Sequence, residues 1–236
     1  MGYNCPMEPT LEPQPALAPP PVEPPPKRWV VPAHAARDVL ETLLLTALIF
    51  LLVRTVDQNF KVDGRSMEPT LQNGQYLLAN RATYWRIDNR ILGQLSPRAE
   101  AAGDPASPGF TYLFGPPQRG DIVVFRVPGD PTRDYIKRVI GVPGDVVEIH
   151  NGAVYVNGQM LQEPYTAAKP AYSSPAERVP PGNYYVLGDN RNYSSDSHSW
   201  GLVPEDNIIG KAWFLYLPVD QIGLIPDVRI HVSATP

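Results

Sequence analysis

The sequence predicts a mainly β protein, with an antiparallel folded-sheet or barrel-like domain that follows one N-terminal transmembrane helix. Two observations lead to this fold class. Short runs rich in Val, Ile, Tyr and Phe recur beyond residue 59, separated by Gly and Pro. One long apolar run precedes them, after an opening segment crowded with proline. We therefore expect a tail at 1–36, an anchor helix at 37–58 and a β-rich domain at 59–236.

Composition excludes several classes of function. The chain has 236 residues, and its 20 Lys and Arg against 24 Asp and Glu give a formal net charge of -4. Such a chain has no basic field for a phosphate backbone, so we expect no nucleic-acid partner. The single cysteine, Cys5, cannot form an internal disulfide or a Cys-rich metal site. No metal-protease, P-loop or dinucleotide motif occurs, so we expect neither a metal nor an organic cofactor.

The opening segment is biased toward proline. Ten of the 29 prolines fall between Pro6 and Pro26. Such a segment cannot bury enough apolar surface to fold. We predict a disordered or polyproline tail over 1–36.

The apolar run lies within "RDVLETLLLTALIFLLVRTVDQNF", where only Thr46 interrupts the aliphatic and aromatic residues from Leu43 to Val53. With its flanks the run approaches the roughly 20 residues that a helix needs to span a bilayer. Polar residues cluster at its ends and form no stripe, which favours a membrane helix over an amphipathic or buried one. The run lies far from Met1 and lacks a small-residue cleavage site, so we expect it to be retained. Basic residues flank both ends about equally and leave the orientation open.

The rest of the chain has the sequence pattern of short β-strands. The runs of strand length are "QYLLAN", "DIVVFRV", "YIKRVIGV", "DVVEIH", "AVYVNG", "NYYVLG" and "KAWFLYL". In "HNGAVYVNGQ", both Asn-Gly pairs favour tight turns with positive φ and so predict hairpins. Residues 81–118 are weakly patterned and rich in proline, and we interpret them as a surface insertion.

Ser66, in "GRSMEPTL", has two interpretations. It could cap a helix, with Glu68 and Pro69 in the first turn. It could instead be a nucleophile, which requires a base. Among the histidines only His198, with Asp189 and Asp196 near it in sequence, could form a Ser-His-Asp arrangement, although serines in that polar loop commonly bond to backbone.

Lys137, in "YIKRVIG", offers a different base. Strand alternation places it on one face with Tyr135 and Val139, whereas Arg138 lies on the other. A lysine packed among apolar groups loses hydration, which can lower its pKa by as much as ~3 to 5 units and leave a neutral amine. The spacing is equally compatible with an edge-strand lysine in water.

Four segments, taken in order, resemble a known family. The segments "SMEPTL", "RGDIVVF", "DYIKRVIGVPGD" and "GDNRNYSSDSHSWGLVP" are similar in content and order to the sequence boxes of type I signal peptidases. These are membrane-anchored serine proteases that remove signal peptides from exported proteins. The resemblance covers Arg37 to about Leu217, without most of the 81–118 insertion.

The resemblance implies a role for each matching residue. Ser66 would attack the scissile carbonyl, and Lys137 would be the general base. Ser194 would help to orient the lysine, and Asp196 would belong to the polar network behind it. The backbone N–H of Ser66 would donate to the oxyanion.

The sequence also departs from the family at three positions. Gly64 stands where some members have a serine that donates a second hydrogen bond to the oxyanion. His198 stands where the family often has arginine, and Asn192 where it often has aspartate. The last two changes leave open whether an ion pair forms there.

By the same resemblance, the protein would be a single-pass plasma-membrane enzyme with its catalytic domain on the extracytoplasmic side and its tail in the cytoplasm. Its partners would be the lipid bilayer and exported preproteins, cut after small residues of the A-x-A kind. The substrate would bind as an added β-strand. The alternatives are a non-catalytic, membrane-tethered β domain that binds extracytoplasmic peptides and, less well supported, a self-cleaving Ser-Lys repressor.

Overall fold

The computed structural model describes residues 33–91, 109–228 and 230. The chain divides into two units, residues 1–45 and 46–236. The predicted tail at 1–36 lies outside the described residues as far as residue 32. The boundaries expected for the three parts of the chain stay predictions.

The apolar run forms a helix, α1, at Ala33–Val56. Nine of its large apolar side chains are between 56% and 62% exposed; they are Val39, Leu40, Leu43, Leu44, Leu45, Leu48, Ile49, Phe50 and Leu51. A search of the described residues for a helix both long enough and apolar enough to cross a membrane finds none.

Most strands beyond residue 56 join one large antiparallel sheet, which runs in the order β1-β2-β13-β5-β6-β11-β12, with β14 paired to β13. Its strands are β1 (Asp57–Lys61), β2 (Tyr76–Asn80), β5 (Ile122–Val127), β6 (Asp130–Gly141), β11 (Asn183–Leu187), β12 (Val203–Pro204), β13 (Ile208–Leu217) and β14 (Gly223–Leu224). The predicted runs therefore are strands, and the mainly β, antiparallel class is confirmed. The central strand β5 is continuously apolar at its start because both of its faces are covered there.

A second sheet has the order β10-β7-β8-β9. It consists of β7 (Val146–His150), β8 (Ala153–Val156), β9 (Gln159–Met160) and β10 (Ser174–Arg178). Asn151 and Asn157, at the two hairpin turns, have φ of 52° and 54°. The hairpins predicted from the two Asn-Gly pairs are confirmed, since such turns need positive φ.

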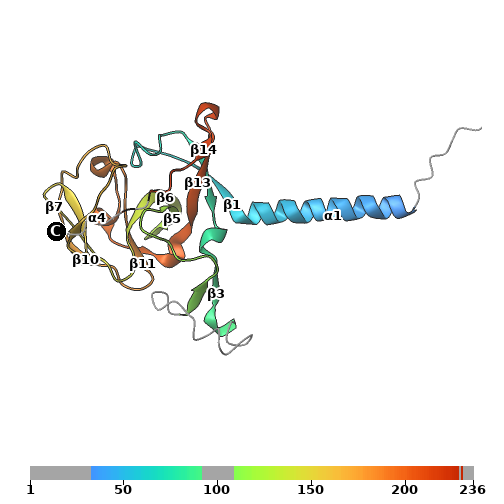
Figure 1. Cartoon of the computed structure of the whole chain (residues 1–236), viewed down its shortest axis with the longest axis horizontal. Coiled ribbons are helices and arrows are strands. Elements are labelled where there is room, and N and C mark those ends of the chain that lie inside the picture. The colour runs from blue at the N-terminus through green and yellow to red at the C-terminus, as the bar shows by residue number, and fades with distance from the viewer. Residues whose placement is uncertain (1–32, 92–108, 229, 231–236) are drawn as a thin grey trace, which may run out of the picture. The chain divides into compact units, whose positions relative to one another are not determined.

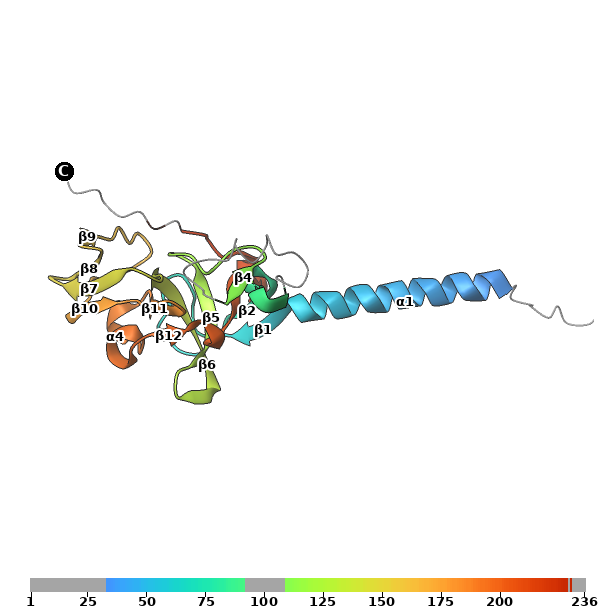
Figure 2. The ribbon, with the colours of Figure 1, turned by 90° about the horizontal axis from the view of Figure 1, so that it is seen from below.

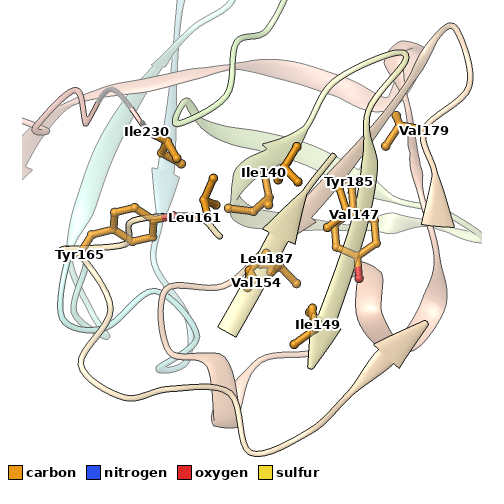
Figure 3. Packing of buried hydrophobic residues seen from close by; sticks show 11 residues of the cluster. Ile140, Val147, Ile149, Val154, Leu161, Tyr165, Val179, Tyr185, Leu187 and Ile230 are labelled. Atoms are coloured by element: carbon orange, nitrogen blue, oxygen red, sulfur yellow. The ribbon is translucent and has the colours of Figure 1, made fainter. Parts of the chain in front are cut away.

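One hydrophobic core joins the two sheets. Figure 3 shows Ile140 of β6 and Leu187 of β11 packed with Val147 of β7 and Val154 of β8. In Figures 1 and 2, β7 to β10 lie at one side of the β-rich unit, and β1, β13 and β14 lie at the opposite side. The long strand β6 thus runs from the large sheet into the core shared with the small sheet.

The described ends of the predicted insertion 81–118 contain a small sheet of β3 (Arg86–Asp88) and β4 (Phe110–Tyr112). Tyr84 and Tyr112 pack against a core cluster of the large sheet, so these ends are attached to the domain. The remaining short helices are η1 (Ala82–Tyr84), η2 (Arg191–Tyr193), α4 (Ser197–Trp200), η3 (Glu205–Asn207) and η4 (Val219–Gln221). Of these, η2 and α4 belong to the segment that surrounds the candidate site.

Candidate active site

Ser66 lies in a turn and does not cap a helix. Residues 66–70 form hydrogen-bonded turns, and no helix follows them. Met67 and Leu71, which are 1% and 2% exposed, anchor the turn in the core. Before the serine, the Gly64 N–H donates to Asn73 Oδ1 at 2.9 Å. Gly64 has a φ of 91°, a conformation that glycine adopts at little cost.

The end of β11 holds the other side of this turn. Asn190 donates from its backbone N–H to the Ser66 carbonyl at 3.0 Å and from its side chain to the Arg65 carbonyl at 3.1 Å. A Cβ at Gly188 would lie 2.5 Å from the Ser66 carbonyl oxygen, so this close approach requires glycine. The backbone N–H of Ser66 has no acceptor among the described residues. It therefore remains free to donate to a substrate oxygen.

Lys137 reaches the same turn from β6. It pairs in register with Val123 of β5, and β11 covers the other edge of β6 from Arg138 onward. The residue is 4% exposed, which rules out a lysine on a solvated edge strand. Its Nζ lies 2.7 Å from the Ser66 Oγ, and it donates to the Ile136 carbonyl at 3.0 Å. The structure thus brings together two side chains that are 71 positions apart in the sequence.

Burial lowers the pKa of Lys137 to about 8, because the charged ammonium loses its hydration. The carboxylates of Asp196 and Asp189 act in the opposite direction and favour the ammonium. The loss of hydration outweighs them. An amine with this pKa is neutral in about a tenth of the molecules at pH 7 and in about half at pH 8, and the neutral form is the one that can act as a general base.

The pair opens into a cavity of about 600 Å³. One wall is formed by residues 61–64, at the end of β1 and just after it, and another by residues 133–136 of β6. Since β11 pairs with β6 only from Arg138 to Gly141, this part of β6 has one unpaired edge within the described structure. The lining is completed by Arg65, Met67, Tyr193 and Ser195.

The two supporting residues predicted by resemblance lie beside the serine turn. The Ser194 Oγ is buried and has no hydrogen-bond partner in the described structure, so its expected bond to Lys137 is not formed here. A Cβ at Gly188 would lie 2.3 Å from that Oγ. Asp196 is fully buried and accepts the Gly188 N–H at 2.8 Å. Their roles stay predictions.

The positions that depart from the family keep polar contacts. His198 Nδ1 lies 2.5 Å from Oδ1 of Asp196, two positions before it. Asn192 makes two hydrogen bonds to the backbone, at Lys169 and Ala171. His198 contacts Asp196 and not Ser66, so no Ser-His-Asp arrangement forms.

The sequence reasoning missed a buried ion pair behind the site. Arg138 donates from Nε and Nη2 to Asp189 at 2.8 and 2.7 Å, and both side chains are fully buried. Thr70, from the serine turn, donates to the same carboxylate at 2.5 Å. The alternation of Ile136, Arg138 and Ile140 was an available signal, because a basic residue between two apolar ones on one strand face needs a buried partner.

The described residues contain no group of three or more His, Cys, Asp or Glu side chains placed to hold a metal ion.

Comparison with known proteins agrees with the motifs. The family model described as "Signal peptidase, peptidase S26" matches residues 36–217. A probable signal peptidase I of Synechocystis is 36% identical over 81% of this chain and 88% of its own. Signal peptidase IB of Staphylococcus aureus is 31% identical over 78% of this chain and 93% of its own.

A solved structure, that of a signal peptidase I from Enterococcus faecalis V583, aligns with 41% of this chain and 97% of its own at 33% identity. Its TM-score is 0.36, so it adds nothing to the assignment. The family model and the relatives suffice: the chain belongs to the peptidase S26 family of signal peptidases, hydrolases among which it is a type I member.

Proposed function

We propose that this protein is a membrane-anchored serine endopeptidase that removes signal peptides from exported preproteins, with Ser66 as nucleophile and Lys137 as general base. One observation carries the mechanism. A lysine that is 4% exposed places its Nζ 2.7 Å from the Ser66 hydroxyl and makes no ion pair within the described residues. A nucleophile within hydrogen-bond distance of a base of lowered pKa is the arrangement that covalent catalysis requires.

In the first step, the neutral Lys137 amine takes the proton of the Ser66 hydroxyl while Oγ attacks the scissile carbonyl carbon. The oxyanion that forms accepts the free backbone N–H of Ser66, and a donor of this kind is worth ~2.7 to 4 kcal/mol in barrier height. The Gly64 N–H donates to Asn73 and so does not serve as the second donor in this arrangement.

In the second step, the intermediate collapses, the peptide C–N bond breaks and the Lys137 ammonium gives its proton to the leaving amine. An acyl group is now esterified to Ser66. Lys137, neutral again, takes a proton from the water that attacks the ester carbonyl. The second intermediate then collapses, the bond between the acyl carbon and Ser66 Oγ breaks, and the Lys137 ammonium returns its proton to Oγ as the carboxylic acid product leaves. Ser194 and Asp196 support Lys137 and the serine turn.

The substrate enters as an added strand. The unpaired edge of β6 at residues 133–136 and the segment 61–64 both line the cavity that contains Ser66. A peptide in extended form would lie between them and bond to their backbone. Side chains at alternate positions would then point into the cavity, which fits cleavage after two small residues separated by one, as in A-x-A.

The anchor rests on a separate observation. The nine large apolar side chains of α1 between Val39 and Leu51 named above keep more than half of their surface exposed, and each would gain free energy by leaving water, at roughly 25 cal/mol per Å². We infer that residues 37–58 cross the plasma membrane once, with the catalytic domain on the extracytoplasmic side and the tail in the cytoplasm.

The test is cleavage of a synthetic preprotein by the purified full-length protein, with the cut site read by mass spectrometry. We expect one cut after an A-x-A sequence. Ser66→Ala and Lys137→Ala should each lower kcat by about 10²- to 10⁴-fold, since each removes one half of the proton transfer. The variant proteins should remain folded by circular dichroism.

The pH dependence tests the base separately. With burial lowering the pKa of Lys137 to about 8, kcat/KM should rise as the pH increases through about 8. A folded wild-type protein that binds the preprotein without cutting it would instead favour the non-catalytic peptide-binding domain.

A further inference from the structure

His198 has no step in the mechanism above, yet it contacts the network behind Ser66 and Lys137. Its Nδ1 lies 2.5 Å from Asp196 Oδ1, and its side chain is 20% exposed. The ring stacks on Tyr172 with centroids 4.0 Å apart and planes 22° apart. Both the edge and the face of the imidazole are therefore fixed by neighbours.

Asp196 connects His198 to the serine turn. Its second oxygen, Oδ2, accepts the Gly188 N–H at 2.8 Å, and no part of Asp196 is exposed. Gly188 is the point at which β11 comes closest to Ser66, because a Cβ there would lie 2.5 Å from the Ser66 carbonyl oxygen. A displacement of the Asp196 carboxylate would therefore shift Gly188 and, with it, the turn that carries Ser66.

Asn192 holds the segment that leads into Tyr172, the residue whose ring stacks on His198. Its side-chain nitrogen donates to the Lys169 carbonyl at 3.0 Å, and its side-chain oxygen accepts the Ala171 N–H at 2.7 Å. Only an amide makes both bonds at once, because an ionised carboxylate has no hydrogen to donate. The segment held in this way continues directly into Tyr172, the residue on which His198 stacks.

We propose that His198 is a positioning residue for the Ser66–Lys137 pair, which acts through the Asp196 carboxylate and is held in place by Tyr172 and Asn192. The inference rests on the proposed function. The imidazole can donate from Nδ1 in both its neutral and its charged form, so it can hold Asp196 in either. Asn192 and His198, the two departures in this loop, then form one unit.

The unit also has an electrostatic effect. The Asp196 carboxylate favours the charged form of Lys137 and so raises its pKa, against the larger effect of burial. A hydrogen bond from His198 partly offsets the negative charge of the Asp196 carboxylate. It therefore reduces the extent to which that carboxylate raises the pKa of Lys137. The other charged and titratable groups around Tyr172 are Tyr185 and the pair Arg191 and Glu163, whose charges are matched at 2.5 Å.

The experiment compares His198→Ala and His198→Arg with the wild type in preprotein cleavage, with kcat, KM and the pH profile of kcat/KM measured. For His198→Ala we expect the rising limb of the profile to move to higher pH by about one unit, which lowers kcat/KM about tenfold below the limb. KM should stay within about twofold. His198→Arg, a fixed cation that can still donate to Asp196, should restore the limb to the wild-type pH or below.

The chain supplies a matched control. His150 also stacks on a tyrosine, Tyr155, at 4.1 Å and also has an acidic partner, Glu148, at 3.6 Å. His150, Tyr155 and Glu148 all lie outside the lining of the cavity that contains Ser66. His150→Ala should leave kcat, KM and the pH limb unchanged.

A His198→Ala protein whose limb stays at the wild-type pH would overturn the proposal, even if its activity fell, because loss of structure alone does not move the limb. If that variant does not fold, Asn192→Ala, at an exposed position, takes its place and should move the limb in the same direction. An unmoved limb there overturns the proposal too. Failure of the proposed function would look different, since the wild type itself would not cut the preprotein.

Discussion

Two neighbouring basic residues on opposite faces of β6 have different kinds of partner. Lys137 and Arg138 are 4% and 0% exposed, so both are removed from water. Arg138 meets the Asp189 carboxylate through two hydrogen bonds and donates a third to the Gly120 carbonyl. Within the described residues, the hydrogen bonds of the Lys137 amine go to a hydroxyl and a carbonyl, those of Ser66 and Ile136.

This difference suggests how one strand can carry, side by side, a cation held by an ion pair and the residue that we propose as the base. A buried cation needs a buried anion, and Arg138 has one in direct contact. Without such a partner, burial dominates at Lys137 and lowers its pKa to about 8. Asp189 is near enough to favour the Lys137 ammonium, but its carboxylate bonds to Arg138 and Thr70.

The largest expected effect comes from replacing the amine of Lys137 with a guanidinium like that of Arg138. Lys137→Arg places a guanidinium, which stays protonated at all working pH, where a proton acceptor is needed. We expect kcat for preprotein cleavage to fall by about 10²- to 10⁴-fold with no recovery at high pH. Kinetics between pH 7 and 10 measure this, and a variant that regains activity as the pH rises would refute the role of the amine.

The second effect concerns stability. Arg138→Met removes the partner of Asp189 and leaves a buried carboxylate unpaired, which should cost about 3–5 kcal/mol of unfolding free energy. Urea denaturation followed by circular dichroism measures the loss. The control is Arg133→Met, because Arg133 is 69% exposed and its substitution should change stability by less than about 0.5 kcal/mol. Equal losses in the two variants would mean that the buried pair does not matter.

The smallest effect is the pH dependence of stability. The pKa of Lys137 is about 8 in the folded protein and 10.5 in its ordinary state, so between these values the unfolded chain binds more protons. The free energy of unfolding should therefore rise with pH across this window, with about 3 kcal/mol contributed by Lys137. Lys137→Met should lack this contribution.

Urea titrations of the wild type and Lys137→Met at several pH values between 7 and 10.5 give the difference directly. Groups that titrate in both proteins cancel in this subtraction. Parallel stability curves for the two proteins would contradict a lowered pKa in the folded state.

The strands were predictable because their signals are local. The Asn151 and Asn157 turns required positive φ, and a strand on each side completed the hairpins. Ser66 and Lys137 were identified from motifs whose order along the chain is characteristic of the family. The residues of the site could thus be named without coordinates.

Other features depended on contacts between distant segments. The pairing of Arg138 with Asp189 spans 51 positions, and sequence alternation indicates only that Arg138 needs some partner. The stacking of His198 on Tyr172 depends on how Asn192 holds the segment before the tyrosine. No local pattern records these contacts, because each depends on where a loop crosses a strand.

By itself, the sequence determined the β-rich class, the hairpin turns, the apolar helix and which serine and lysine to examine, because backbone propensity and side-chain chemistry act over a few neighbouring residues. Only the tertiary structure decided that Lys137 is buried with no ion pair to any described residue, while Arg138, one position away, has Asp189. Desolvation and ion pairing depend on every atom that surrounds a group, and most of those atoms come from other parts of the chain.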